Sequence, residues 1–190
     1  LKAFVDVTGD QTHDNDTVTM GTYIFKTFVV PYETAFDEAE GNDHFYAYNA
    51  IASNPTNCWE MGVPDETNSV IKTPYSEPNC WKTKLSGKHP KNNESILYSP
   101  IFDVNIVKPD TLSFMMRMDA AMANAKMYVE YLNWEGKWVL LGEYDDDNAQ
   151  NWYNSEENYW EGTRSWTKVV YSLNHLNYMF GNQFQLRFVF

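Results

Sequence analysis

The chain has 190 residues and a formal net charge of −12, and 43% of its residues are hydrophobic and 16% aromatic. This length suits one domain, or one domain with a fragment of another, and the apolar content argues against disorder. The negative charge, with no cluster of Lys and Arg, excludes nucleic acid as a predicted partner and disfavours an anionic membrane surface. No run of 18 apolar residues occurs, so we expect no membrane span.

Residues 1–30 contain the first two predicted strands, at 1–7 and 22–30, joined by the polar turn 9–16. Two strands cannot bury a core alone, so we predict that 1–30 is the C-terminal part of a preceding immunoglobulin-like domain. A domain boundary is predicted near Pro31. Because the sequence opens and closes in strand patterns and shows no signal peptide, we expect it to be an internal piece of a longer chain.

Residues 31–190 show the alternation of period two that is typical of half-buried antiparallel strands. In 183–190, for example, apolar residues at even positions alternate with Gln183, Gln185 and Arg187. The same alternation predicts a strand at 112–118. Further strands are predicted at 81–85, 96–98, 101–104, 126–132, 137–142 and 166–173. Many short strands separated by polar turns indicate an all-β antiparallel sandwich or barrel.

Both cysteines of the chain, Cys58 and Cys80, stand in the tripeptide Asn-Cys-Trp. Two cysteines cannot complete a four-ligand zinc site, and the 21-residue gap between them excludes a C-x-x-C redox motif. A disulfide or two buried thiols remain. We predict the disulfide, which would contribute on the order of 3 kcal/mol by closing a loop of about 20 residues.

Short motifs follow one another in a fixed order along 31–190. They are Trp59-Glu-Met-Gly62-Val-Pro64, Cys80-Trp81-Lys-Thr83-Lys-Leu85-Ser-Gly87, Leu97-Tyr-Ser99-Pro100-Ile-Phe102-Asp103, Leu112-Ser-Phe114, Val129-Glu-Tyr131, Leu141-Gly142, Asn151-Trp-Tyr153, Trp166 and Phe184-Gln-Leu-Arg-Phe-Val-Phe190. In this order they resemble the adhesin-type jelly-roll modules, related to MAM and cleaved-adhesin domains, of large secreted Bacteroidota proteins. Residues 1–30 resemble the end of the CARDB-type immunoglobulin-like domains that often precede such modules.

The resemblance implies an antiparallel jelly-roll β-sandwich over 31–190, truncated before its last strand. It implies a bacterial protein that is exported, with type IX secretion as the expected route, or held at the cell surface. The function implied is a non-catalytic binding or adhesion module that recognises a glycan or protein surface, beside other domains of the same chain. Two alternatives stay open: an accessory domain of a secreted peptidase or glycosidase whose active site lies elsewhere, and a structural spacer in a surface filament.

Two acidic loops contain the oxygen ligands that hard cations prefer. The resembled modules often hold a structural Ca²⁺, and the candidate ligands here are Asp37, Asp145 and Asp147. Asp37 stands where the family usually has Glu, and Asn124 stands near a position where it often has Asp. A solvated acidic loop is the alternative.

Catalytic motifs are missing from the sequence. It contains no H-E-x-x-H, G-x-S-x-G, Cys/His nucleophile pair or P-loop, so we predict that this segment is not an enzyme.

The predicted ligand site is the amide- and aromatic-rich loop 148–161. An exposed aromatic face beside hydrogen-bonding groups is what glycan binding requires, and the candidate residues are Trp152, Tyr153, Tyr159 and Trp160. Trp134, Trp138 and Trp160 are expected to be partly exposed, because they lie in or beside polar loops. Trp59, Trp81, Trp152 and Trp166 are expected in the core of a thin sandwich. The alternative for the loop is that Trp152 fills the core and the rest is solvated.

Overall fold

The structure, a computed structural model, describes residues 2–4, 17–19, 26–37, 44–49, 58–90, 93–120 and 125–190. Its strands are β1 (Lys2–Phe4), β2 (Thr17–Thr19), β3 (Thr27–Val29), β4 (Tyr46–Asn49), β5 (Trp59–Gly62), β6 (Cys80–Thr83), β7 (Ser95–Tyr98), β8 (Ile101–Asp103), β9 (Thr111–Ala120), β10 (Tyr128–Leu132), β11 (Trp138–Leu140), β12 (Ala149–Gln150), β13 (Gly162–Ser172), β14 (Gln183–Phe184) and β15 (Leu186–Val189). A 3₁₀ helix, η2 (Asn174–Leu176), follows β13. No helix of the described residues is long and apolar enough to cross a membrane.

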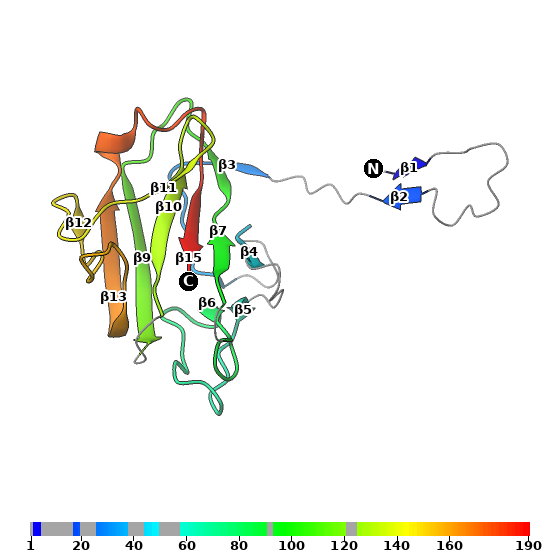
Figure 1. Ribbon diagram of the computed structural model, residues 1–190, viewed down its shortest axis with the longest axis vertical. Helices are drawn as coiled ribbons and strands as arrows, with labels where there is room; N and C mark the ends of the chain where they lie inside the picture. The colour runs from blue at the N-terminus through cyan, green and yellow to red at the C-terminus, as the bar shows by residue number, and fades with distance from the viewer. Residues whose placement is uncertain are drawn as a thin grey trace.

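Two antiparallel sheets enclose the main core (Figure 1). One has the strand order β11-β10-β15-β7-β4, and the other has the order β12-β13-β9. β9 and β13 form the longest pair, from Gly162 opposite Ala120 to Ser172 opposite Thr111. The all-β sandwich predicted from the sequence is therefore confirmed, whereas its jelly-roll connectivity stays a prediction.

Two neighbouring strands leave the five-stranded sheet through a shared bend. β7 continues beyond Ser99 as β8, and β14 leads through Gln185 into β15. β8 and β14 pair in a further sheet, in which β3 joins β8 in parallel. At the bend, Gln185 Nε2 donates to the Ser99 carbonyl (2.9 Å), and Ser99 Oγ accepts from Leu186 N (2.9 Å). Strands that switch sheets in this way make the corners of a sandwich.

The predicted alternation holds along β9 but not throughout the five-stranded sheet, where Val189 and three consecutive residues of β7, Ser95–Leu97, are also buried. In β9, Met116 and Met118 are buried and Arg117 is exposed. Gln185 was predicted on the polar face, but the bend turns it into the interior, where it is buried and hydrogen-bonded. A buried amide is tolerated because it has found a partner.

Residues 1–30 contain two separate pairings. β1 pairs with β2, with Lys2 opposite Thr19 and Phe4 opposite Thr17, whereas β3 pairs with β8 of the sandwich. The polar turn predicted at 9–16 lies outside the described residues. The predicted division of the chain at residue 31 stays a prediction.

Aromatic side chains fill the space between the two main sheets. Phe114 of β9 reaches the opposite sheet, where its ring lies edge-on to Phe188, with 5.3 Å between centroids. It also meets Trp160 at 6.0 Å. Val129 and Val169 are fully enclosed nearby. Large rings can span the roughly 10 Å between stacked sheets, so a few of them build this core.

Gly142 marks the closest approach of the backbone to this aromatic core. Its φ is +72°, and a Cβ there would lie 2.4 Å from Tyr171 Cε2 and 2.7 Å from Trp152 Nε1. We expect Gly142→Ala to lower the free energy of unfolding by about 2–5 kcal/mol, from left-handed strain and overpacking together. Urea unfolding followed by tryptophan fluorescence measures this change.

Gly136→Ala is the matched control for Gly142→Ala. Gly136 has a similar φ of +75°, but no atom lies within 4 Å of its added Cβ. For Gly136→Ala we expect the free energy of unfolding to fall by only about 1–2 kcal/mol, because only the left-handed conformation is unfavourable there. Equal losses in the two variants would show that the close packing around Gly142 is not as described.

Candidate functional site

The aromatic loop predicted to bind ligand is part of the core. The exposed fraction is 5% for Trp152, 5% for Tyr153 and 0% for Trp160. The predicted exposure of Trp160 is therefore wrong. The ring of Trp152 lies 5.0 Å from that of Trp160 and 4.6 Å from that of Tyr171. These rings pack against one another and offer no face to solvent.

Each polar atom of these buried rings has a hydrogen-bond partner. Trp152 Nε1 donates to the Leu141 carbonyl (3.1 Å), and Trp160 Nε1 donates to the Asn151 carbonyl (3.3 Å). The Tyr153 hydroxyl accepts from Val129 N (3.0 Å) and donates to its carbonyl (3.2 Å). Burial raises the pKa of Tyr153, so the hydroxyl stays protonated. The loop is thereby fastened to the sheet.

Tyr159 is the one predicted ligand residue that is half-buried. Lys126 Nζ lies 4.2 Å from its ring centroid, and its hydroxyl donates to Glu157 Oε2 (3.1 Å). Lys126 and Glu157 form an ion pair at 3.0 Å. The ring and hydroxyl of Tyr159 are thus engaged within the protein. Ligand binding by these four residues stays a prediction that their packing does not favour.

The acidic candidates do not converge in the described part of the chain. Asp37, Asp145 and Asp147 are exposed, and no group of three His, Cys, Asp or Glu among the described residues is placed to hold a metal. The carboxylate between the last two, Asp146, turns inward and accepts from Tyr171 Oη (2.7 Å). Residues 38–43 of the first acidic loop lie outside the described residues, so the calcium site stays a prediction.

Hydrogen bonds from Asn148 and Tyr171 hold the Asp146 carboxylate. Burial acts to raise its pKa, but bonds from Asn148 and Tyr171 outweigh burial, and the pKa lies below its usual value. The carboxylate is therefore charged and already has donors. It fixes the 143–148 turn against β13.

The predicted disulfide is not formed, because both cysteines are free. In the β5–β6 hairpin, Gly62 lies opposite Cys80 and Trp59 lies opposite Thr83. Cys58 is four residues before Gly62, so the two cysteines are offset by about 13 Å at about 3.3 Å per residue. A disulfide requires Cα atoms within about 7 Å. The pairing register therefore excludes the bond.

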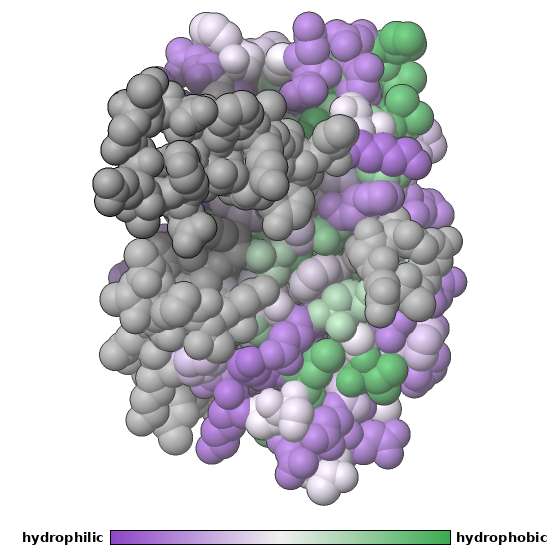
Figure 2. Space-filling model, turned by 90° about the vertical axis from the view of Figure 1, so that its right-hand side faces the viewer, coloured by the Kyte–Doolittle hydropathy of each residue, from purple (hydrophilic) through white to green (hydrophobic). Residues whose placement is uncertain are grey.

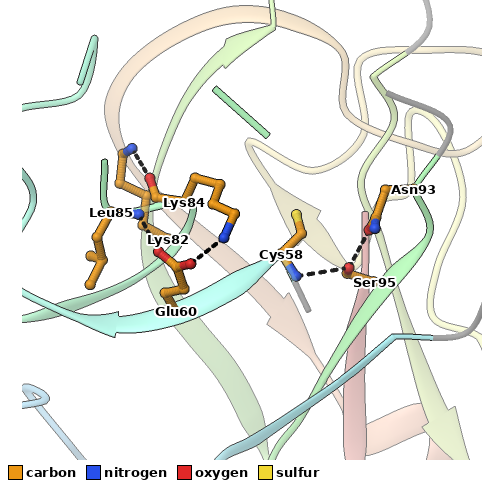
Figure 3. A network of polar contacts seen from close by, with 7 residues as sticks. All are labelled: Cys58, Glu60, Lys82, Lys84, Leu85, Asn93 and Ser95. Carbon is orange, nitrogen blue, oxygen red and sulfur yellow. Dashed lines mark hydrogen bonds and ion pairs between the residues drawn. The ribbon is translucent and has the colours of Figure 1, made fainter. Parts of the chain in front are cut away.

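A polar network surrounds Cys58 (Figure 3). Cys58 N donates to Ser95 Oγ (3.2 Å), which in turn bonds to Asn93. On the other side, Glu60 accepts from Lys84 Nζ and from Leu85 N (2.8 Å). Burial raises the pKa of the Cys58 thiol to about 11, so it is not a thiolate nucleophile at neutral pH. The network joins the hairpin to β7, and its groups are already satisfied.

The tryptophans predicted in the core follow that prediction to different extents. Trp59 is buried, and its Nε1 donates to the Ser95 carbonyl (3.3 Å). Trp81 packs against the core from its edge. Trp166 is half-buried, with its ring edge-on to the exposed Tyr75 at 5.8 Å. The prediction is confirmed for Trp59 and Trp152, and the other two are only partly enclosed.

The outer face of the five-stranded sheet carries aromatic and charged side chains that contact one another. Arg187 pairs with Glu130, and its guanidinium lies 4.6 Å from the ring centroid of Trp138. Tyr46 and Tyr98 stack at 4.8 Å. Trp138 is half-buried, which confirms its predicted partial exposure. These mutual contacts are those of cross-strand pairs that stabilise a sheet.

Four exposed apolar side chains gather at one end of the sandwich. We call Ile106, Val107, Trp134 and Tyr178 the loop-end patch. Their exposed fractions are 96%, 50%, 64% and 78%. They come from the β8–β9 loop, the β10–β11 turn and the segment after η2, which lie together at the upper end of Figure 1. The predicted exposure of Trp134 is confirmed.

Hydrogen bonds hold these three loops together. Trp134 N donates to the Met179 carbonyl (2.9 Å), and Val104 N donates to the Asn182 carbonyl (3.0 Å). Lys108 Nζ donates to the Gly181 carbonyl (3.2 Å). In the side view of Figure 2, hydrophilic side chains dominate the described surface, and exposed apolar groups occur at the upper end and also in the lower half. The patch is therefore presented by a connected framework.

Only one member of the loop-end patch could be predicted from the sequence. Trp134 was singled out by its polar surroundings, but Ile106, Val107 and Tyr178 were not. An apolar pair within the polar turn Asn105-Ile-Val-Lys108 is the feature that could have indicated the patch. Nothing local in the sequence shows that this turn lies beside Trp134.

Comparisons with protein-family models, curated proteins and solved structures find no match for this chain. The resemblance to adhesin-type modules accordingly remains an expectation from short motifs.

The free cysteines lead to a direct chemical prediction. In denaturant without reductant, iodoacetamide should add to both Cys58 and Cys80. In the native protein Cys58 should react more slowly than Cys80, because it is fully enclosed whereas Cys80 is half-buried. Intact and peptide mass spectrometry follow both reactions. A chain that takes up no label in denaturant until it is reduced would contradict the register of the β5–β6 hairpin.

Proposed function

We propose that this chain is a non-catalytic binding module of a secreted or cell-surface protein and that it binds a protein or glycan surface through the loop-end patch. One observation carries this proposal: Ile106, Trp134 and Tyr178 are each more than half exposed, on three loops that are hydrogen-bonded to one another. Loops displayed at the end of a rigid sandwich are where binding sites commonly form.

Exposed apolar groups that lie together favour binding. Single exposed apolar residues are common, but a group of large ones rimmed by polar residues marks an interaction site. Trp and Tyr are also the side chains that most often dominate binding energy. Of the seven tryptophans in the sequence, Trp134 is the one that is exposed, at 64%, and the other six are buried or half-buried.

The side chains of the patch support binding rather than catalysis. Ile106, Val107 and Trp134 contain no acid, base or nucleophile, and the fourth member, Tyr178, adds a single phenol hydroxyl. The charged groups nearest to them in the hairpin turn, Glu135 and Lys137, pair with each other at 2.8 Å. A structural spacer would give no reason for this exposure. An accessory role beside a hydrolase would use the same binding chemistry.

Trp134→Ala tests the proposal. On an array of printed glycans and purified extracellular proteins, we expect the variant to bind its targets at least about 10-fold more weakly than the unmodified chain. Its free energy of unfolding should change by no more than about 0.5 kcal/mol, because the side chain is exposed. Binding and urea unfolding are measured on the same preparations.

Val70→Ala is the matched control for Trp134→Ala. Val70 is 64% exposed, like Trp134, but lies in the connection between β5 and β6. The Val70→Ala variant should leave both target binding and the free energy of unfolding unchanged. An array without bound targets, or binding that Trp134→Ala leaves intact, would refute the proposal.

A further inference from the structure

Two exposed carboxylates border the loop-end patch on the β8–β9 loop. Asp103 ends β8 and Asp110 precedes β9, three residues on either side of the Ile106–Val107 pair. Asp103 Oδ1 accepts from Asn105 N (2.9 Å) and Asn105 Nδ2 (2.8 Å), which fixes the start of the loop. Neither carboxylate makes an ion pair with another described residue. Both charges therefore face the solvent beside the patch.

The lysines of the same loops are engaged elsewhere. Lys108, within the β8–β9 loop, donates to the Gly181 carbonyl, and Lys137 pairs with Glu135. Lys108 keeps its positive charge, because its acceptor is a neutral carbonyl, so the two charges of Asp103 and Asp110 leave this rim with a net excess of one negative charge. The whole chain carries a formal charge of −12, which has the same sign. An approaching molecule therefore meets an apolar centre with an acidic border.

The aliphatic part of the patch indicates what kind of surface fits it. A sugar ring stacks on aromatic faces and needs hydrogen-bond partners beside them. Ile106, the most exposed member at 96%, offers neither an aromatic face nor a polar side-chain atom, and Val107 adds a second aliphatic group. Contact with Ile106 and Val107 stabilises a complex by burying apolar area, which a protein partner supplies.

We infer that the loop-end patch binds a protein partner with an apolar recess bordered by Lys or Arg side chains. This inference rests on the proposed function and names the ligand class of the same site. A second copy of the chain does not fit, because two identical acidic borders would repel each other. Complementary charges at the border accelerate association and are screened by salt.

The test compares two double variants on the array of glycans and extracellular proteins, which should include acidic and basic proteins. D103N/D110N removes the border charges and keeps the side-chain shapes. E66Q/D119N removes two exposed charges in the β5–β6 connection and at the far end of β9. Binding is measured by surface plasmon resonance at about 0.05 M and about 0.5 M NaCl, where charges are weakly and strongly screened respectively.

The inference predicts that basic proteins are bound and that Trp134→Ala weakens their binding at least about 10-fold. D103N/D110N should weaken it about 5- to 10-fold at low salt and less than about 2-fold at high salt, mainly through the association rate. E66Q/D119N should change it by less than about 2-fold.

Other outcomes separate the inference from the proposed function. Glycans or acidic proteins bound through Trp134 would overturn the inference and leave the proposed function standing. Self-association that Trp134→Ala abolishes, seen by analytical ultracentrifugation, would also overturn it. If both double variants weaken the binding of basic proteins equally, the proposed contribution of Asp103 and Asp110 to binding is refuted. If Trp134→Ala still binds every target as strongly as the unmodified chain, both proposals are overturned.

Discussion

The rest of the structure depends on the packing of four aromatic rings beside the β12-β13-β9 sheet. They belong to Trp152, Tyr153, Trp160 and Tyr171. The rings lie 4.6–5.2 Å from their neighbours in this group, and each is at most 5% exposed. Their polar atoms bond to Leu141, Val129, Asn151 and Asp146. Trp152, Tyr153 and Trp160 of the 143–161 connection are thereby part of the core and are not available to a ligand.

The loop-end patch contrasts with this enclosure, because its apolar side chains are at least half exposed. The core aromatic rings are covered by one another, whereas Trp134 and Tyr178 are mostly exposed to solvent. A net charge far from zero keeps a protein with exposed apolar groups soluble and disfavours contact between copies. The acidic composition and the exposed patch are therefore compatible, and together they favour a partner of opposite charge.

The sequence predicted what depends on local alternation and missed what depends on pairing. Period two identified β9 and β15 and most of their buried faces, but not the bend that buries Gln185. The cysteines share a tripeptide, yet the register of β5 and β6 separates them. Trp160 looks exposed between Tyr159 and Glu161, but Asn154 bonds both backbone groups of Glu161 and Trp160 pairs with Met127, so the ring turns inward.

The central claim, that the aromatic loop is enclosed and the loop-end patch is open, can be measured without any ligand. Hydroxyl-radical footprinting with mass spectrometry reports the accessibility of each aromatic side chain. Trp134 and Tyr178 should be modified fastest, and Trp152, Tyr153 and Trp160 should stay protected until the protein unfolds. Rapid modification of Trp160 in the native protein, with Trp134 protected, would contradict this account.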